Sequence, residues 1–139
     1  MKFTRKASAN WQGGGKEGKG LLTTESSVLS NTAYSYHTRF EDAQGTNPEE
    51  LVGAAHAGCY AMQLSFLLVG EGFSDMTLDV GAEVNFEDGS ITSIVLNLDA
   101  SVADIGESQF QELAQKAKEI CPISKLMNTE IVLNSNFKN

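Results

Sequence analysis

The longest stretch of the chain without a charged residue runs from Leu51 to Gly70, and most of its side chains are apolar. The residues before it are typical of a helix start. Asn47 can cap, Pro48 suits the first helical position, and Glu50 completes a capping box. Since apolar side chains would fall on every face of this helix, we expect it to be buried on all sides. We predict a central core helix with the rest of the domain wrapped around it.

A membrane span is the alternative interpretation of these twenty uncharged residues. Glycines, His56, Gln63 and Ser65 interrupt the run, and acidic residues flank it on both sides. A span would instead carry basic residues on its cytoplasmic side. The sequence therefore predicts the core helix of a soluble domain and no membrane segment.

Alternating apolar and polar residues predict strands on both sides of the helix. Three strands are expected before it, at residues 2–11, about 20–25 and about 33–40. In the third of these, Tyr34, Tyr36 and Thr38 would share one face of the sheet. Three more are expected after it, at residues 76–87, 90–102 and 129–137, with an Asp-Gly hairpin turn between the first two.

The glycine-rich segment 13–20 formally contains a G-x-G-x-x-G motif. Such a motif binds phosphate only where a helix follows directly, because the helix N-terminus meets the anion. Here a strand is predicted to follow. We therefore expect the segment to be a hairpin loop.

Apolar residues recur at the spacing of one helix face over residues 107–120, and Cys121-Pro122 ends that helix. Pro122 can begin a short new helix, which leaves Cys121 at its cap. The order of elements, βββ-α-ββ-α-α-β, indicates an α+β fold with the long helix lying across a largely antiparallel sheet. For a chain of 139 residues we expect a single domain, 1–139.

The formal charge of −8 excludes a surface built for nucleic acid or for an anionic membrane. The first residues lack the apolar core and cleavage site of a secretory signal, so we expect a cytoplasmic protein. In a reducing compartment, two cysteines 62 positions apart are not expected to form a permanent structural disulfide. They are either inert core residues or they carry chemistry.

Cys59 lies in the middle of the long helix among small residues, where a second helix or a substrate can come close. Its ordinary interpretation is a small buried hydrophobe. Cys121, at a helix start, has a physical route to a lowered pKa, whereas a reactive Cys59 would need a cation nearby. Arg39 is the candidate, since its planar fork can hold a thiolate and a carboxylate together. Glu49 is the better candidate for that carboxylate, because capping accounts for Glu50.

The spacing of Glu49 and Cys59 raises a difficulty for this arrangement. Ten residues of straight helix place them about 15 Å apart along the axis. Contact therefore needs a bend near Gly53 or an arrival from a second subunit.

His56 offers a rival chemistry, because it lies three residues before Cys59 and so shares a helix face with it. A Cys–His pair is the nucleophile and base of some hydrolases, or half of a zinc site. The sequence has no further Cys and His cluster with ligand spacing, and a satisfied core histidine is the commoner outcome. A non-catalytic dimeric binding domain is a further alternative, and it would tolerate the loss of either cysteine.

Four groups of residues are informative in combination. They are Thr38-Arg39-Phe40, Gly45-Thr46-Asn47-Pro48-Glu49-Glu50-Leu51, Ala54-Ala55-His56-Ala57-Gly58-Cys59, and Lys116-Ala117-Lys118 with Cys121-Pro122. Together they resemble the OsmC/Ohr family of thiol-dependent peroxidases, and the similarity covers essentially the whole chain. In that family Cys59 matches the peroxidatic cysteine, Cys121 the resolving cysteine and Glu49 the catalytic glutamate.

The resemblance implies an OsmC-like fold with antiparallel sheets packed on the central helix, an intertwined homodimer with active sites at the interface, and the reduction of organic hydroperoxides. A Cys59–Cys121 disulfide would form and be reduced by an external dithiol of the lipoyl type, without metal, flavin or haem. Arg39 matches the arginine of the osmotically inducible (OsmC) branch. The organic-hydroperoxide-resistance branch carries its arginine nearer the start of the chain, where this sequence has Lys19.

Overall fold

The structure is a computed structural model, and it describes residues 1–138. The chain divides into two units, Met1–Leu51 and Val52–Asn139. Each unit has a three-stranded sheet of its own. The long helix α2, Pro48–Gly70, begins in the first unit and contributes most of its length to the second.

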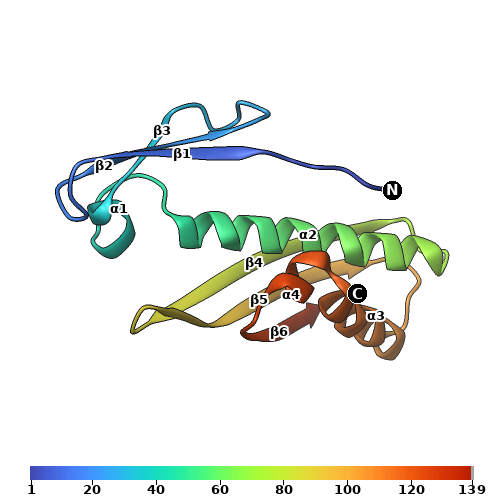
Figure 1. Ribbon diagram of the computed structural model, residues 1–139. Coiled ribbons are helices and arrows are strands. Elements are labelled where there is room, and N and C mark those ends of the chain that lie inside the picture. Colours follow the sequence, from blue (N-terminus) through green and yellow to red (C-terminus); the bar gives the residue numbers. More distant parts are fainter. Residues whose placement is uncertain (139) are drawn as a thin grey trace. The chain divides into compact units, whose positions relative to one another are not determined.

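The first unit is built on a small antiparallel sheet in the order β1-β2-β3 (Figure 1). Its strands are β1 (Ala7–Gln12), β2 (Lys19–Thr24) and β3 (Thr32–Tyr34). The expected hairpin loop is confirmed between β1 and β2, and it turns at Gly13, whose φ of +94° suits a residue without a side chain. The strand expected over 2–11 begins later, because pairing with β2 starts only at Ala7.

The strand expected over 33–40 is wrong beyond Tyr34, because residues Tyr36–Phe40 form the short helix α1. A capping box explains the change. The Thr38 backbone N–H donates to the Ser35 hydroxyl at 3.3 Å, and the Ser35 N–H donates to the Thr38 hydroxyl at 2.9 Å. This local pattern prevails over the polar and apolar alternation, and it places Arg39 in the last turn of a helix.

The N-cap of α2 follows the sequence prediction, but the Glu50 carboxylate bonds Thr46 in place of the Asn47 backbone N–H that a capping box requires. The Glu50 backbone N–H donates to the Asn47 side-chain oxygen at 2.7 Å, so Asn47 caps the helix. The Glu50 carboxylate accepts from the Thr46 hydroxyl at 2.8 Å. Capping thus accounts for Glu50 and leaves its neighbour Glu49 available for another partner.

The second unit contains the larger sheet, in the order β4-β5-β6, and two further helices (Figure 1). Its strands are β4 (Met76–Glu87), β5 (Ser90–Val102) and β6 (Glu130–Phe137), and its helices are α3 (Glu107–Ile120) and α4 (Pro122–Leu126). The predicted Asp-Gly turn is confirmed, since Asp88 and Gly89 both have positive φ between β4 and β5.

One strand pairing differs from the largely antiparallel arrangement that we expected. β4 and β5 are antiparallel, but β6 runs parallel to β5. Parallel neighbours need a crossover connection, and α3 with α4 supplies it. The crossover brings Cys121, which lies between these two helices, back over the sheet.

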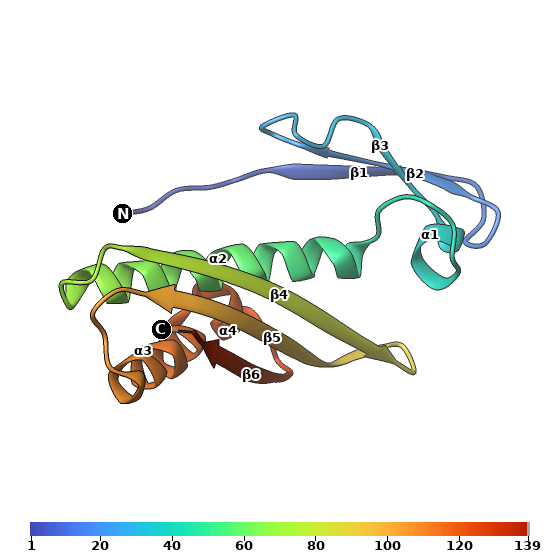
Figure 2. The ribbon, with the colours of Figure 1, turned by 180° about the vertical axis from the view of Figure 1, so that it is seen from behind.

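The core of the second unit lies between one face of this sheet and the helices. Alternate residues of β5 are buried, and their partners are large side chains from α2 and α3, namely Tyr60, Leu64, Leu68 and Phe110. Both α2 and α4 lie on this face, in front of the sheet in Figure 1 and behind it in Figure 2. The other face carries polar pairs such as Asn97 with Glu83. The second unit is therefore two layers thick, with all its helices on one side.

The expectation that α2 is buried on all sides is not met within one chain. Its buried residues recur on a single face, at Gly53, His56, Tyr60, Leu64 and Leu68. The opposite face leaves Met62, Phe66 and Val69 exposed by 61%, 64% and 57%. One sheet covers only one side of the helix, so an apolar face is left open.

Candidate active site

The two cysteines lie next to each other in the second unit. Cys59 is in the middle of α2 and Cys121 caps the start of α4, and the Cys121 Sγ lies 3.0 Å from the Cys59 Sγ. Both are free thiols in this structure. Cys121 is completely buried, whereas Cys59 is only half-buried. A reagent from solution therefore reaches the Cys59 sulfur first.

The surroundings of Cys59 disfavour its thiolate. Burial raises the pKa of the Cys59 thiol, and the hydrogen bond with Cys121 raises it further. One group acts the other way, since the backbone N–H of Ile123 in the first turn of α4 donates to the Cys59 sulfur and lowers its pKa. The sequence predicted that the N–H groups at the start of α4 would stabilise a thiolate on Cys121. In the structure, one of these groups, the Ile123 N–H, donates to Cys59 instead.

Arg39 and Glu49 form a close ion pair in the first unit, as their proposed roles require. The Arg39 Nε donates to both Glu49 carboxylate oxygens at 3.0 and 3.2 Å, and its Nη2 donates to Oε1 at 2.7 Å. Burial alone would raise the pKa of Glu49, but hydrogen bonds from Arg39 and from its own backbone, with the guanidinium charge, outweigh burial and lower the pKa. The hydrogen bonds to Glu49 likewise raise the pKa of Arg39.

Aromatic rings surround the Arg39 side chain within the first unit. A hollow of about 240 Å³ is lined by Arg39 together with Trp11, Tyr34, Tyr36 and Phe40. The Arg39 guanidinium lies 5.0 Å from the Phe40 ring centroid, and the rings of Trp11 and Tyr34 are 5.5 Å apart. The surroundings suit an apolar group placed next to a fixed positive charge.

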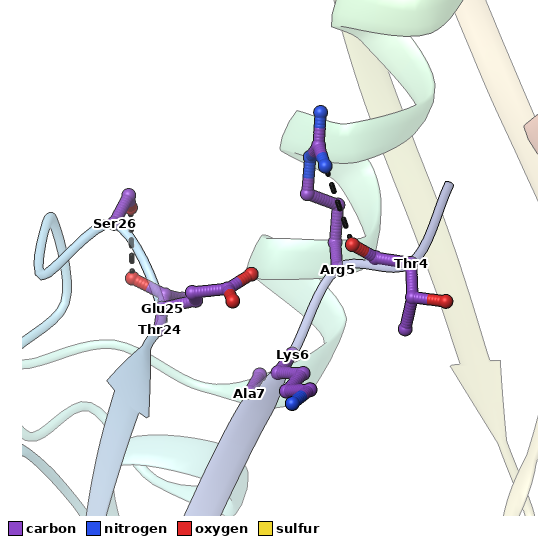
Figure 3. Close-up of a pocket in the computed structure, with 7 residues that line it drawn as sticks. All are labelled: Thr4, Arg5, Lys6, Ala7, Thr24, Glu25 and Ser26. Carbon is purple, nitrogen blue, oxygen red and sulfur yellow. Dashed lines mark hydrogen bonds between the residues drawn. The ribbon is translucent and has the colours of Figure 1, made fainter. Parts of the chain in front are cut away.

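A second hollow of about 580 Å³ lies in the first unit between residues 4–7 and 24–26 (Figure 3). Its side chains bond locally, with the Arg5 Nη1 donating to the Thr4 carbonyl at 3.2 Å and the hydroxyls of Thr24 and Ser26 3.2 Å apart. It contains neither cysteine and neither member of the Arg39–Glu49 pair. We therefore do not count it as part of the candidate active site.

His56 has a partner other than Cys59. It is completely buried, and its Nε2 lies 2.7 Å from the Ser124 hydroxyl of α4. Burial lowers the pKa of His56, which favours the neutral form of the ring. This bond accounts for the histidine as a core residue, and it does not favour the hydrolase alternative, in which His56 would serve Cys59 as a base.

Comparisons with known proteins identify the family of the chain. The family of OsmC-like proteins matches residues 41–136. The chain is 42% identical over 142 residues to peroxiredoxin OsmC of Escherichia coli K12, and the match covers 99% of both proteins. The chain belongs to the OsmC-like family.

Solved structures of OsmC-like proteins share the fold. An OsmC-like protein of Vibrio cholerae superposes with a TM-score of 0.72 at 16% identity, over 97% of this chain and all of the other. The organic hydroperoxide resistance protein OhrB of Bacillus subtilis gives 0.62 at 26% identity, over 98% of each chain. Against the curated OhrB sequence the identity is 29%, below the 42% to OsmC, as expected from the position of Arg39.

Family membership also settles the interpretation of the apolar helix. Within residues 1–138, α2 is the one helix that is long and apolar enough to cross a membrane. It is instead the core helix of a soluble OsmC-family protein, packed on the sheet through His56, Tyr60 and Leu64.

Two members of the site carry no sequence motif of their own. Ser124 partners His56 from 68 positions away, and Ile123 donates only its backbone N–H. The proline at the start of α4 was the available signal, since it indicates that the residues after Cys121 form a helix whose N–H groups are free to donate.

Proposed function

We propose that this protein is a thiol peroxidase that reduces organic hydroperoxides to alcohols, with Cys59 as the peroxidatic cysteine and Cys121 as the resolving cysteine. The observation that carries the proposal is the 3.0 Å separation of the two sulfurs, with Cys59 accessible and Cys121 buried. Full-length identity of 42% to a peroxiredoxin supports the same chemistry.

The reaction has three steps. The Cys59 thiolate attacks a peroxide oxygen, so that an S–O bond forms, the O–O bond breaks and the alkoxide takes a proton to leave as the alcohol. The Cys121 sulfur then attacks the sulfenic acid, and the S–O bond breaks with release of water as the disulfide forms. An external dithiol, for which we propose the lipoyl type, reduces the disulfide and is itself oxidised.

Arg39 and Glu49 activate Cys59 in this proposal. The Cys59 thiol has a raised pKa, so its thiolate requires a positive charge in addition to the Ile123 N–H. Arg39 supplies the charge, and Glu49 holds the guanidinium in a fixed orientation through three hydrogen bonds. The aromatic hollow beside Arg39 would receive the organic part of the hydroperoxide.

We propose further that the protein is a homodimer and that the Arg39–Glu49 pair reaches Cys59 from a second copy. α2 is helical throughout Pro48–Gly70, so ten residues between Glu49 and Cys59 correspond to about 15 Å of rise. Met62, Phe66 and Val69 form an exposed apolar stripe on α2, and the exposed small residues Ala54, Ala55 and Gly58 extend it. A matching stripe from a second copy would cover this surface.

The oligomeric state is tested by sedimentation. We expect a dimer at micromolar concentration for the native chain, and a monomer for Met62→Glu combined with Phe66→Glu, because two carboxylates would be buried in the interface. Phe86→Glu, an exposed site on β4, is the matched control and should stay dimeric. A native chain that sediments as a monomer would refute the dimer.

The activity is tested by turnover of tert-butyl hydroperoxide with two reductants, dihydrolipoamide and a monothiol such as glutathione. We expect sustained turnover with the dithiol and at least tenfold less with the monothiol. We also expect hydrogen peroxide to be the poorer substrate, since it lacks an apolar group. The absence of alkyl hydroperoxide consumption with both reductants would refute the proposed function.

We further propose a cytoplasmic location, where free thiols persist between catalytic cycles.

A further inference from the structure

The buried hydrogen bond between His56 and Ser124 has no place in the proposed reaction, yet it lies directly beside the two thiols. His56 is completely buried and Ser124 is only 8% exposed. The His56 Nε2 and the Ser124 Oγ are 2.7 Å apart. A bond this short between two buried side chains fixes the separation of the elements that carry them.

The bond repeats the connection that the cysteines make. His56 lies three residues before Cys59 on α2, and Ser124 lies three residues after Cys121 in α4. Residues three apart share a helix face. α2 and α4 are therefore joined at two adjacent points, by the sulfurs at 3.0 Å and by the histidine and serine at 2.7 Å. In the proposed reaction the sulfur contact becomes a disulfide, whereas neither His56 nor Ser124 is a reactant.

α4 needs such an anchor because it is short. It has five residues, Pro122–Leu126, and Ser124 is its one buried residue. A helix of this length is not stable without tertiary contacts. The position of α4, and with it the position of the Cys121 sulfur, therefore depends on tertiary contacts, namely the packing of Ile123 on the core and the bond of Ser124 to His56.

The other ring nitrogen of His56 adds a second observation. Nδ1 is buried and has no hydrogen-bond partner among residues 1–138. An apolar side chain of similar size would avoid this unpaired polar atom. The specific contribution of the imidazole at this position is therefore the single bond that it makes to Ser124.

We propose that His56 and Ser124 are positioning residues that hold α4 against α2 and so keep the Cys121 sulfur within reach of the Cys59 sulfenic acid. This inference rests on the proposed function for its role in the catalytic cycle. The step that it assists is the condensation in which the S–S bond forms and water leaves. Fast condensation protects Cys59, because a second peroxide molecule otherwise oxidises the sulfenic acid to sulfinic acid.

Ser124→Ala tests the inference by separating the two chemical steps. We expect Cys59 to consume the first equivalent of tert-butyl hydroperoxide at the native rate, within a factor of two. The following disulfide formation should slow at least tenfold, and mass spectrometry should find sulfinic Cys59 at peroxide concentrations where the native chain shows only disulfide. Ser124→Thr, which keeps the hydroxyl, should restore the native partition between disulfide and sulfinic acid.

Tyr60→Phe is the matched control, because it removes another buried hydrogen bond from α2. The Tyr60 hydroxyl donates to the Ala114 carbonyl of α3 at 3.0 Å, so this bond joins α2 to α3 and not to α4. We expect this variant to lose stability but to keep the native rate of disulfide formation. If Ser124→Ala and Tyr60→Phe change that rate equally, or if neither changes it, the positioning role is refuted.

A peroxide-free measurement separates this inference from the proposed function. The Cys59–Cys121 disulfide is equilibrated with reduced and oxidised dithiothreitol, and its equilibrium constant is compared between variants. We expect Ser124→Ala and His56→Gln to lower the constant for disulfide formation at least tenfold relative to Tyr60→Phe, since the thiols are held together less firmly. A constant equal to that of Tyr60→Phe would overturn the inference even if the protein proved to be a peroxidase. Should the native chain fail to reduce peroxide, a lowered constant would still support the positioning role.

Discussion

The Arg39–Glu49 pair of the first unit is charged and partly exposed, whereas the Cys59–Cys121 pair of the second unit consists of one half-buried and one buried thiol. The arginine side chain is 38% exposed and the glutamate 17%, and both stay ionised because each stabilises the charge of the other. The cysteines have the opposite setting, since burial raises the pKa of Cys59.

In the proposed mechanism, the difference between the two pairs separates storage of the nucleophile from its activation. A thiol with a raised pKa is protonated and protected, since thiolates are the reactive form. In the proposed mechanism the charge that ionises Cys59 comes from Arg39, whose guanidinium Glu49 orients. We infer that Cys59 is reactive only where a guanidinium lies next to it. This would confine the reaction to the proposed site that combines Cys59 with the Arg39–Glu49 pair.

The largest effect is expected from breaking the thiol pair. Cys59→Ser should abolish peroxidase activity, because serine does not supply the nucleophile. Cys121→Ser should still react once, consuming about one equivalent of hydroperoxide per site and leaving Cys59 as sulfenic acid. Mass spectrometry after a single peroxide addition should show a loss of two hydrogen atoms in the native chain and a gain of one oxygen on Cys59 in Cys121→Ser. A modification on the other cysteine would reverse the two roles.

The next largest effect is expected from removing the charge. Arg39→Ala should slow peroxide reduction about 100-fold, comparable to the loss of one charge-stabilising donor in other active sites, with a much smaller effect on folding. The pKa of Cys59 should rise further in the variant, as measured by the pH dependence of its alkylation. Arg5→Ala is the matched control, since Arg5 is the other arginine of the chain and donates only to the adjacent Thr4 carbonyl in the contacts described. An unchanged Cys59 pKa in Arg39→Ala would remove arginine from the mechanism.

The two pairs also differ in how far the sequence predicted them. The Arg39–Glu49 contact was expected from residue chemistry, since capping accounted for Glu50 and left Glu49 free to pair. The contact of Cys59 with Cys121 spans 62 positions, and only the resemblance to the OsmC/Ohr family implied it. The bond from His56 to Ser124 is as distant and has no motif, so the sequence offered no route to it.

The secondary structure follows the same division between local and distant signals. The turn at Asp88-Gly89 and the helix Glu107–Ile120 were predicted with correct bounds, because turn chemistry and helix periodicity are local. The strand expected through Tyr36–Phe40 was wrong because two local signals competed, and the Ser35 cap prevailed. The parallel pairing of β6 depends on the path of the crossover, which strand patterns do not encode.

A smaller effect is expected from Glu49→Gln, which leaves one acceptor oxygen beside Arg39 but removes the charge. Activity should fall about tenfold, within the range for groups that act through a neighbour. The native carboxyl has a lowered pKa, so its contribution to stability is complete above the unfolded value of about 4.3 and is lost as the pH falls through the folded value. In the variant, the free energy of unfolding should therefore decrease less steeply as the pH falls below 4, as measured by circular dichroism.

Glu50→Gln is the control for that experiment, because Glu50 bonds Thr46 and does not contact Arg39 in the interactions described. It should keep native activity. Equal losses of activity in both variants would mean that activity depends on the negative charge at the start of the helix and not on the contact with Arg39.

The smallest effect is expected at the cap that directs Arg39. Ser35→Ala removes the hydroxyl that accepts the Thr38 N–H at 3.3 Å, and a lost N-cap of this kind costs about 1 kcal/mol. For a chain of this size the melting temperature should fall by about 4 °C. Since α1 carries Arg39, a loosened cap should also lower peroxidase activity a fewfold. The rate of disulfide formation from preformed sulfenic acid should not change, because that step depends on the second unit. Ser35→Asp keeps an acceptor at the cap and should restore both stability and activity. If Ser35→Ala slowed disulfide formation as much as it slowed peroxide reduction, the separation between the charged pair and the thiol pair would not hold.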